Sequence, residues 1–131
     1  MSGVADNHTL SSGERADLDL AIRKAEQLCR AEFSVFVGRS DGDPHAFATS
    51  LHNSLVAPSR SILIMVDPAV RAIEVVTGSH VRRTLNDHLA DLAIATMTAT
   101  FAEGDLVGGL RRGIQQLARS ARPENTLHSG S

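Results

Sequence analysis

The feature that most constrains the fold of this chain is a short segment, residues 61–66, that is apolar on both faces. From Ile62 to Val66 every side chain is apolar, without the alternation of apolar and polar residues that marks a half-exposed strand. A strand reads as a continuous apolar run when layers of structure cover both of its faces. We therefore predict that residues 61–66 form a central strand of a sheet with helices on both sides.

Four other segments carry apolar residues at helical spacing, and each begins with a residue that caps helices well. Ser11 is followed by Glu14 three residues later, which is a capping box and predicts a helix over residues 13–30. Asp43 followed by Pro44 predicts the start of a second helix. The expected caps of the remaining helices are Asn86 or Asp87 for a long helix that stops at Gly104, and Asp105 for a last helix.

Two further apolar segments, residues 33–37 and 70–76, are expected to be strands. Asp67 and Pro68 indicate a turn, so residues 61–66 and 70–76 should form an antiparallel hairpin. Strands 33–37 and 61–66 flank a helix and should be parallel. The order α-β-α-β-β-α-α predicts an α/β fold, a three-layer α/β/α sandwich on a small mixed sheet.

Composition limits the function classes open to this chain. The net charge is −2 and there is no Trp or Tyr, so we expect no nucleic-acid partner. The longest apolar run is far below the roughly 20 residues that span a membrane, so no membrane insertion is expected. Residues 1–12 are polar and show no secretory signal, and Cys29 is the single cysteine, which together favour the cytoplasm.

One domain is expected, over residues 11–121, because the chain has 131 residues. Residues 1–10 and 122–131 are expected to be disordered tails.

Acidic residues follow the ends of the two strands that we expect to be parallel. Asp41, Asp43 and Asp67 come after these strands, and Asp87 stands at the head of the long helix. Open α/β sheets place ligands at this edge, and carboxylates suit Ca²⁺ or Mg²⁺. The alternative is that Asp43 and Asp87 serve helix ends and that Asp67 serves the turn.

Glycine and arginine clusters occur later in the chain. Four glycines between Gly104 and Gly113 lack the ending of a phosphate-binding loop, and we interpret them as sites of close helix packing. The arginine pairs at 82–83 and 111–112 are typical of solvated faces. If they converged, they could bind an anion or an acidic partner.

Three stretches of the chain resemble the TPM domain family, named for thylakoid-lumen phosphatase-like, photosystem-repair and channel-modulator proteins. They are the helix start at residues 10–15, the hairpin at 62–78, and the Gly-Asp stretch at 101–113. The resemblance covers residues 10–119 and is closest to a small bacterial subgroup of unknown function. It implies a Rossmann-like sandwich without a dinucleotide site, divalent-metal binding through acidic loops, and acid-phosphatase activity in some members.

The loop after the hairpin departs from the pattern of the family. Members commonly carry an aromatic residue and an acid there, whereas this chain has Gly78, Ser79 and His80, with His80 about where the acid would be. We treat these three residues as a candidate ligand loop.

The hypothesis that the sequence favours is a non-catalytic module that binds a small ligand or a partner protein at the loop edge. An enzyme, a metal-dependent phosphatase using Asp41, Asp43 and Asp67, is the first alternative, although no catalytic set is evident. The second alternative is a self-association domain that uses the sheet edge or the last helix.

Overall fold

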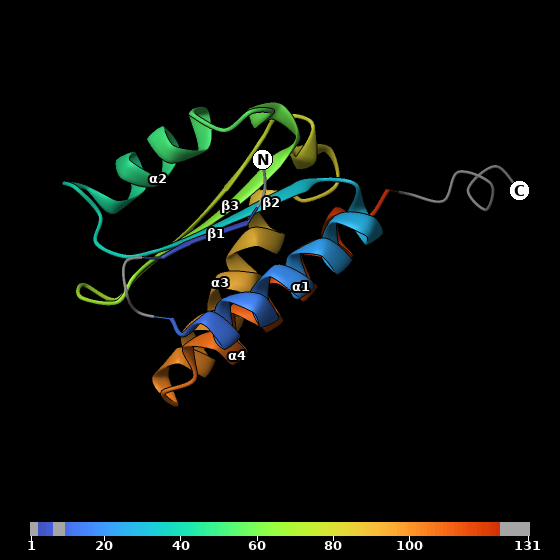
Figure 1. Ribbon diagram of the computed structural model, residues 1–131. Coiled ribbons are helices and arrows are strands. Elements are labelled where there is room, and N and C mark those ends of the chain that lie inside the picture. Colours follow the sequence, from blue (N-terminus) through green and yellow to red (C-terminus); the bar gives the residue numbers. More distant parts are fainter. Residues whose placement is uncertain (1–2, 7–9, 124–131) are drawn as a thin grey trace, which may run out of the picture.

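The computed structural model describes residues 3–6 and 10–123 of the chain and shows one four-stranded sheet (Figure 1). The strands follow one another in the order β1-β2-β3-β4. The first three are parallel, and β4 is antiparallel to β3. The elements are β1 (Gly3–Asp6), α1 (Ser12–Cys29), β2 (Glu32–Val37), α2 (Pro44–Asn53), η1 (Pro58–Arg60), β3 (Ser61–Asp67), β4 (Ala72–Thr77), η2 (Val81–Arg83), α3 (Asp87–Ala102) and α4 (Leu106–Ala121).

Helices cover both faces of the sheet, which confirms the predicted α/β sandwich. Figure 1 shows α2 on one side and α1, α3 and α4 on the other. The larger core joins these three helices to the sheet, whereas the smaller core lies between α2 and the strands.

Strand β3 is buried along its whole length, as the apolar run predicted. Ile62 and Ile64 belong to the larger core, and Leu63 and Met65 belong to the smaller one. Successive side chains of a strand point to opposite faces, so β3 supplies apolar groups to both layers.

The predicted helix starts are confirmed. They could be predicted from the sequence because each cap contacts residues within one helical turn. The Ser11 hydroxyl accepts from the Glu14 amide, and the Glu14 carboxylate accepts from the Ser11 amide. Of the two candidates for α3, Asn86 is the cap. Asp105 caps α4 by accepting a hydrogen bond of 2.8 Å from the Gly108 amide.

The prediction that residues 1–10 are disordered is wrong for Gly3–Asp6. These residues form β1, which pairs with β2 in a register that places Val4 opposite Val35. The element order therefore begins with a strand. The sequence hides it because an edge strand is short and needs little apolar character, and here Val4 is its only large apolar residue. Residues 10, 122 and 123 lie in no helix or strand, and the rest of the two ends, residues 1–2, 7–9 and 124–131, lies outside the described residues.

The register of the strands defines two edges of the sheet. Asp67 pairs with Ala72, so β2 and β3 end where β4 begins; we call this side the carboxyl edge. Glu32 pairs with Ser61, and Thr77 pairs with Ile62, so the opposite side holds the starts of β2 and β3 and the end of β4. We call that side the amino edge.

Candidate functional site

At the carboxyl edge, Asp67 is buried, with 3% of its surface exposed, and its carboxylate has partners on both oxygens. Oδ2 accepts from the Ser40 amide at 2.8 Å and from the Ser40 hydroxyl at 2.7 Å, and Oδ1 accepts from the Ala69 amide at 3.0 Å. These hydrogen bonds hold the pKa of the Asp67 carboxyl below its usual range, and the bond from the Ser40 amide has the largest effect. Asp67 therefore fastens the loop after β2 to the turn after β3.

The other aspartates predicted for a metal site do not gather around Asp67. Asp43 caps α2 by accepting from the Ala46 amide at 2.9 Å, and Asp41 is exposed in the loop. Asp87 is the first residue of α3, which follows η2 on the amino-edge side. Within the described ranges, 3–6 and 10–123, no three His, Cys, Asp or Glu side chains are placed to hold a metal ion.

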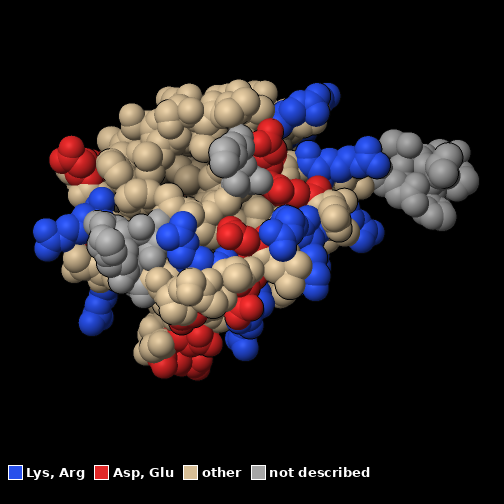
Figure 2. Space-filling view, in the orientation of Figure 1, with Lys and Arg blue, Asp and Glu red and all other residues tan. Residues whose placement is uncertain are grey.

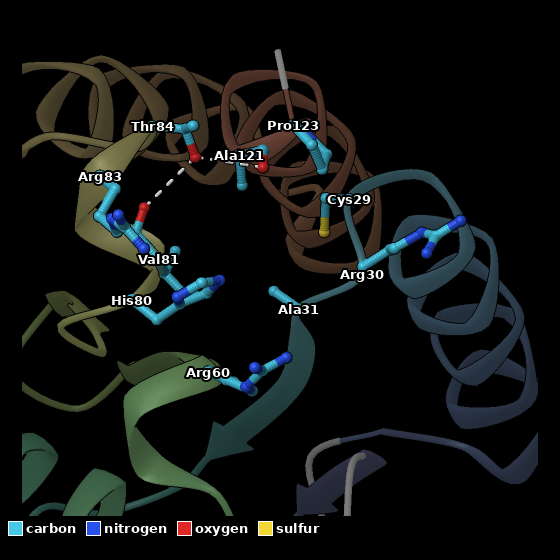
Figure 3. Close-up of a pocket in the computed structure, with 10 residues that line it drawn as sticks. All are labelled: Cys29, Arg30, Ala31, Arg60, His80, Val81, Arg83, Thr84, Ala121 and Pro123. Carbon is cyan, nitrogen blue, oxygen red and sulfur yellow. Dashed lines mark hydrogen bonds between the residues drawn. The ribbon is translucent and has the colours of Figure 1, made fainter. Parts of the chain in front are cut away.

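A pocket of about 520 Å³ opens at the amino edge (Figure 3). The segments that meet there are the end of α1, the turn into β2, η1, η2 and the end of α4. Its walls are formed by Cys29, Arg30, Ala31, Arg60, His80, Val81, Arg83, Thr84, Ala121 and Pro123.

Sheet topology explains why cationic side chains collect at this pocket. Arg30 precedes β2 and Arg60 directly precedes β3, so the parallel pairing of these strands places both arginines at the same edge. Strand β4 runs back to this edge and delivers His80 and Arg83 just beyond its end.

The backbone around η1 and the turn after β4 is tightly packed. The Gly78 amide donates to the Ser61 carbonyl at 2.9 Å, and the His80 amide donates to the Ser59 carbonyl at 2.9 Å. A Cβ on Gly78 would lie 2.1 Å from the Pro58 carbonyl oxygen, so this approach requires glycine. These contacts hold the backbones of Arg60 and His80 side by side.

The pocket combines cationic groups with apolar walls. None of its lining residues is Asp or Glu, and within the described part of the chain Arg30, Arg60 and Arg83 form no ion pair. Burial raises the pKa of the Cys29 thiol, which is therefore neutral near pH 7 and adds no negative charge. The apolar surface comes from Ala31, Val81, Ala121 and Pro123.

The structure brings part of the candidate ligand loop into this pocket. His80 is a lining residue, Gly78 is buried, and Ser79 is exposed. Arg82 donates instead to the Thr77 carbonyl.

Arg30 and Arg60 were not among the residues singled out from the sequence. A signal was present, because β2 and β3 each have an arginine one or two residues before the start of the strand.

A second, shallower hollow of about 300 Å³ lies between β1, β2 and α2. The segment from residue 44 to 59 contains no Lys, Arg, Asp or Glu, and Figure 2 shows the resulting uncharged surface over α2. Phe36, Leu51 and Leu55 are half-buried residues of this hollow. Strand β2 is therefore less completely covered on this face than β3.

By its fold and its sites, this chain is a small α/β sandwich domain with helices on both faces of a mixed sheet. Among the described residues, no helix combines the length and apolar character needed to cross a membrane. The chain belongs to the family described as Domain of unknown function (DUF5130), which it matches over residues 2–118.

Two curated relatives come from Mycobacterium tuberculosis. The uncharacterised protein Rv2468c of strain H37Rv is 32% identical over 106 residues, which is 81% of this chain and 64% of that protein. The uncharacterised protein MT2543 of strain CDC 1551 gives the same values. This chain thus spans less than two thirds of the length of these relatives.

Solved structures with a similar fold share little sequence with this chain. The NMR structure of the BA42 protein from Bizionia argentinensis has a TM-score of 0.79 at 19% identity, covering 92% of this chain and 89% of that one. The N-terminal domain of a P. gingivalis protein has a TM-score of 0.76 at 20% identity, covering 89% and 80%. At these identities, the likeness shows the fold alone.

Proposed function

We propose that this chain is a non-catalytic binding module and that its small-ligand site is the amino-edge pocket. The observation that carries the proposal is the pocket itself, whose volume of about 520 Å³ falls within the range typical of small-molecule sites, roughly 300–1,000 Å³. Such sites pair apolar walls with a few polar groups, and both are present here. The ligand site proposed here is at the amino edge of the sheet, whereas the sequence led us to expect it at the carboxyl edge.

Two reactive side chains, the carboxylate of Asp67 and the thiol of Cys29, are in environments that do not favour catalysis. The Asp67 carboxylate is committed to three hydrogen bonds with Ser40 and Ala69. The raised pKa of Cys29 disfavours the thiolate that a cysteine nucleophile needs. Neither group is prepared for nucleophilic or acid–base chemistry.

A TPM-like character and a cytoplasmic location are parts of the same proposal. The TPM likeness is supported by the helix start at residues 10–15, the hairpin, and the Gly-Asp stretch before α4. The cytoplasmic location is supported by Cys29, the single cysteine, which is a buried thiol as expected in a reducing compartment.

The proposal can be tested by NMR, by titrating the ¹⁵N-labelled chain with a set of anionic, neutral and cationic small aromatic compounds. We expect saturable shifts in the amide signals of the pocket, such as those of Ala31, Val81 and Thr84. The variant Ala31→Leu should fill the pocket and abolish these shifts. The matched control, Ala46→Leu on the exposed surface of α2, should leave them unchanged.

Two results would overturn the proposal. One is a set of saturable shifts that centres on the carboxyl edge, around Ser40 and Asp43. The other is binding that persists unchanged in a folded Ala31→Leu variant. If Ala31→Leu does not fold, Ala121→Val changes the pocket volume by less and serves the same purpose.

A further inference from the structure

We propose that the amino-edge pocket recognises a small organic phosphate monoester. The inference rests on the proposed function, because it names the class of ligand for that same pocket. Its basis is the convergence of cationic side chains from three separate segments onto a cavity with apolar walls and without acidic lining residues.

The side chains of the pocket are directed in ways that suit an anion between them. Figure 3 shows the Arg60 guanidinium and the His80 imidazole reaching toward the space in front of Ala31, with Arg83 beside Val81. The Arg30 guanidinium is directed away from this space in the same view. Arg60, His80 and Arg83 are therefore the groups that would contact the anion first, and Arg30 would contribute charge from the rim.

Arginine is the side chain best suited to this task. Its planar guanidinium carries several donors and binds phosphate oxygens in pairs. Because Arg60 and Arg83 have no carboxylate partner in the described part of the chain, a ligand does not have to displace one. The Gly78 contact holds η1 against the turn after β4, so these donors start from a fixed backbone.

The charge of the pocket favours a dianion over a carboxylate. Arg30, Arg60 and Arg83 all line it, and no lining residue is acidic. A phosphate monoester carries about −1.5 to −2 at pH 7 and three acceptor oxygens, whereas a carboxylate carries one charge. The phosphate can therefore accept hydrogen bonds from more of the arginine N–H groups than a carboxylate can.

The apolar walls indicate that the ligand has an organic body. Ala31, Val81 and Ala121 present carbon surface to the cavity. Such surface gains little from inorganic phosphate, but it stabilises an apolar group by roughly 25 cal/mol for each Å² removed from water. The geometry thus points to a phosphate attached to an apolar or aromatic group.

The test uses four probes with the full chain at constant ionic strength: phenyl phosphate, benzoate and benzyl alcohol, which share a phenyl ring, and inorganic phosphate, which lacks it. Amide shifts in NMR titrations give the Kd of each. We expect phenyl phosphate to bind at least tenfold more tightly than the other three. Raising the salt concentration should weaken its binding, because charge drives part of it.

Substitutions of the pocket arginines test where the anionic group binds. Arg60→Gln and Arg83→Gln should each weaken phenyl phosphate binding about tenfold while leaving benzyl alcohol binding unchanged. The matched control is Arg112→Gln, which removes the same charge from the exposed surface of α4 and should change neither Kd. Thermal unfolding of each variant shows that it is folded.

The outcomes separate this inference from the proposed function. Equal binding of benzyl alcohol and phenyl phosphate in the pocket, or a preference for benzoate, would overturn the phosphate inference and leave the binding module intact. Unchanged phenyl phosphate affinity in folded Arg60→Gln and Arg83→Gln would also overturn it. If no probe shifts the pocket signals at all, both proposals fail.

Discussion

At the scale of single residues, Asp67 shows how a carboxylate at a sheet edge can be a structural group. Its partners, Ser40 and Ala69, lie on two different loops, and Ser40 is 27 positions away from Asp67 in the sequence. The sequence predicted the position of Asp67 at the end of β3 correctly. It did not reveal Ser40 as the partner, because that contact exists only once β2 and β3 lie side by side.

Removing this carboxylate should destabilise the fold. We expect Asp67→Ala to cost about 1.5–3 kcal/mol, because hydrogen bonds to a charged acceptor are lost and buried donors are left unpaired. Asp67→Asn keeps an acceptor and should cost less. Urea unfolding at pH 7 measures both, with the exposed Asp41→Ala as the control. A loss in Asp67→Ala no larger than that of the control would show that the contacts are not stabilising.

The same carboxylate makes stability depend on pH in the acid range. Because folding lowers the pKa of Asp67, its contribution is fully present above the ordinary Asp value of about 3.9 and is lost as the pH falls through the lower folded value. The difference in unfolding free energy between the wild type and Asp67→Asn should therefore shrink as the pH falls below about 4. A difference that stays constant down to pH 2 would contradict this assignment.

The contribution of His45 to stability should depend on pH in the opposite direction to that of Asp67. Its Nδ1 lies 2.9 Å from Oε1 of Glu74, and this contact raises the pKa of the imidazole. The pair stabilises the fold below about pH 6.5 and ceases to do so as the pH rises through the raised folded value. In Glu74→Gln, the pKa of His45 measured by NMR should fall toward its ordinary value. An unchanged His45 pKa would show that the contact does not persist in solution.

At the scale of elements, Gly109 and Gly113 of α4 are packing sites, as predicted, whereas Gly108 meets only the Asp105 cap of its own helix and Gly104 has no neighbouring atom within 4 Å of an added Cβ. A Cβ on Gly109 would lie 2.4 Å from an edge carbon of Phe101, and a Cβ on Gly113 would lie 2.4 Å from the sulfur of Met97. Both partners belong to α3, so these glycines let α3 and α4 approach closely.

A matched pair of glycine substitutions tests this packing. Gly109→Ala should destabilise by about 1–3 kcal/mol, because the added methyl overfills a tight contact. Gly13→Ala in α1 meets no atom within 4 Å and should stabilise by roughly 0.5–1 kcal/mol through helix propensity. Chemical denaturation of the two variants gives the comparison. Equal effects of the same sign would rule out the close approach as the cause.

Local signals account for what the sequence predicted well. The cap of α1 depends on Ser11 and Glu14, and that of α2 depends on Asp43 and Pro44, all within one helical turn. Strand β1 escaped prediction because an edge strand depends on its neighbour rather than on its own apolar content. The sequence did not predict the pocket for a similar reason. Arg60 and His80 lie close together only because β3 pairs with β4, and a local sequence pattern does not show that pairing.

At the scale of the whole molecule, the sheet is asymmetric in how firmly its strands are held. Strand β3 has a partner on each side and is covered on both faces, whereas β1 pairs only with β2 and lies beside the hollow under α2. Strand β4 is also at an edge, but Ile73 and Val75 pack against the larger core and Val76 against the smaller one. The three strands therefore differ in packing although they belong to one sheet.

Native-state hydrogen exchange should follow this order. Amides of β3 that bond to neighbouring strands should exchange only through global unfolding, because breaking them exposes both cores. Amides that join β1 to β2 should exchange through local opening, with a free energy well below the global value. The amides that join β4 to β3 serve as the control, because β4 is an edge strand whose side chains are packed. If β1 and β4 exchange alike, edge position rather than packing sets the local stability of this sheet.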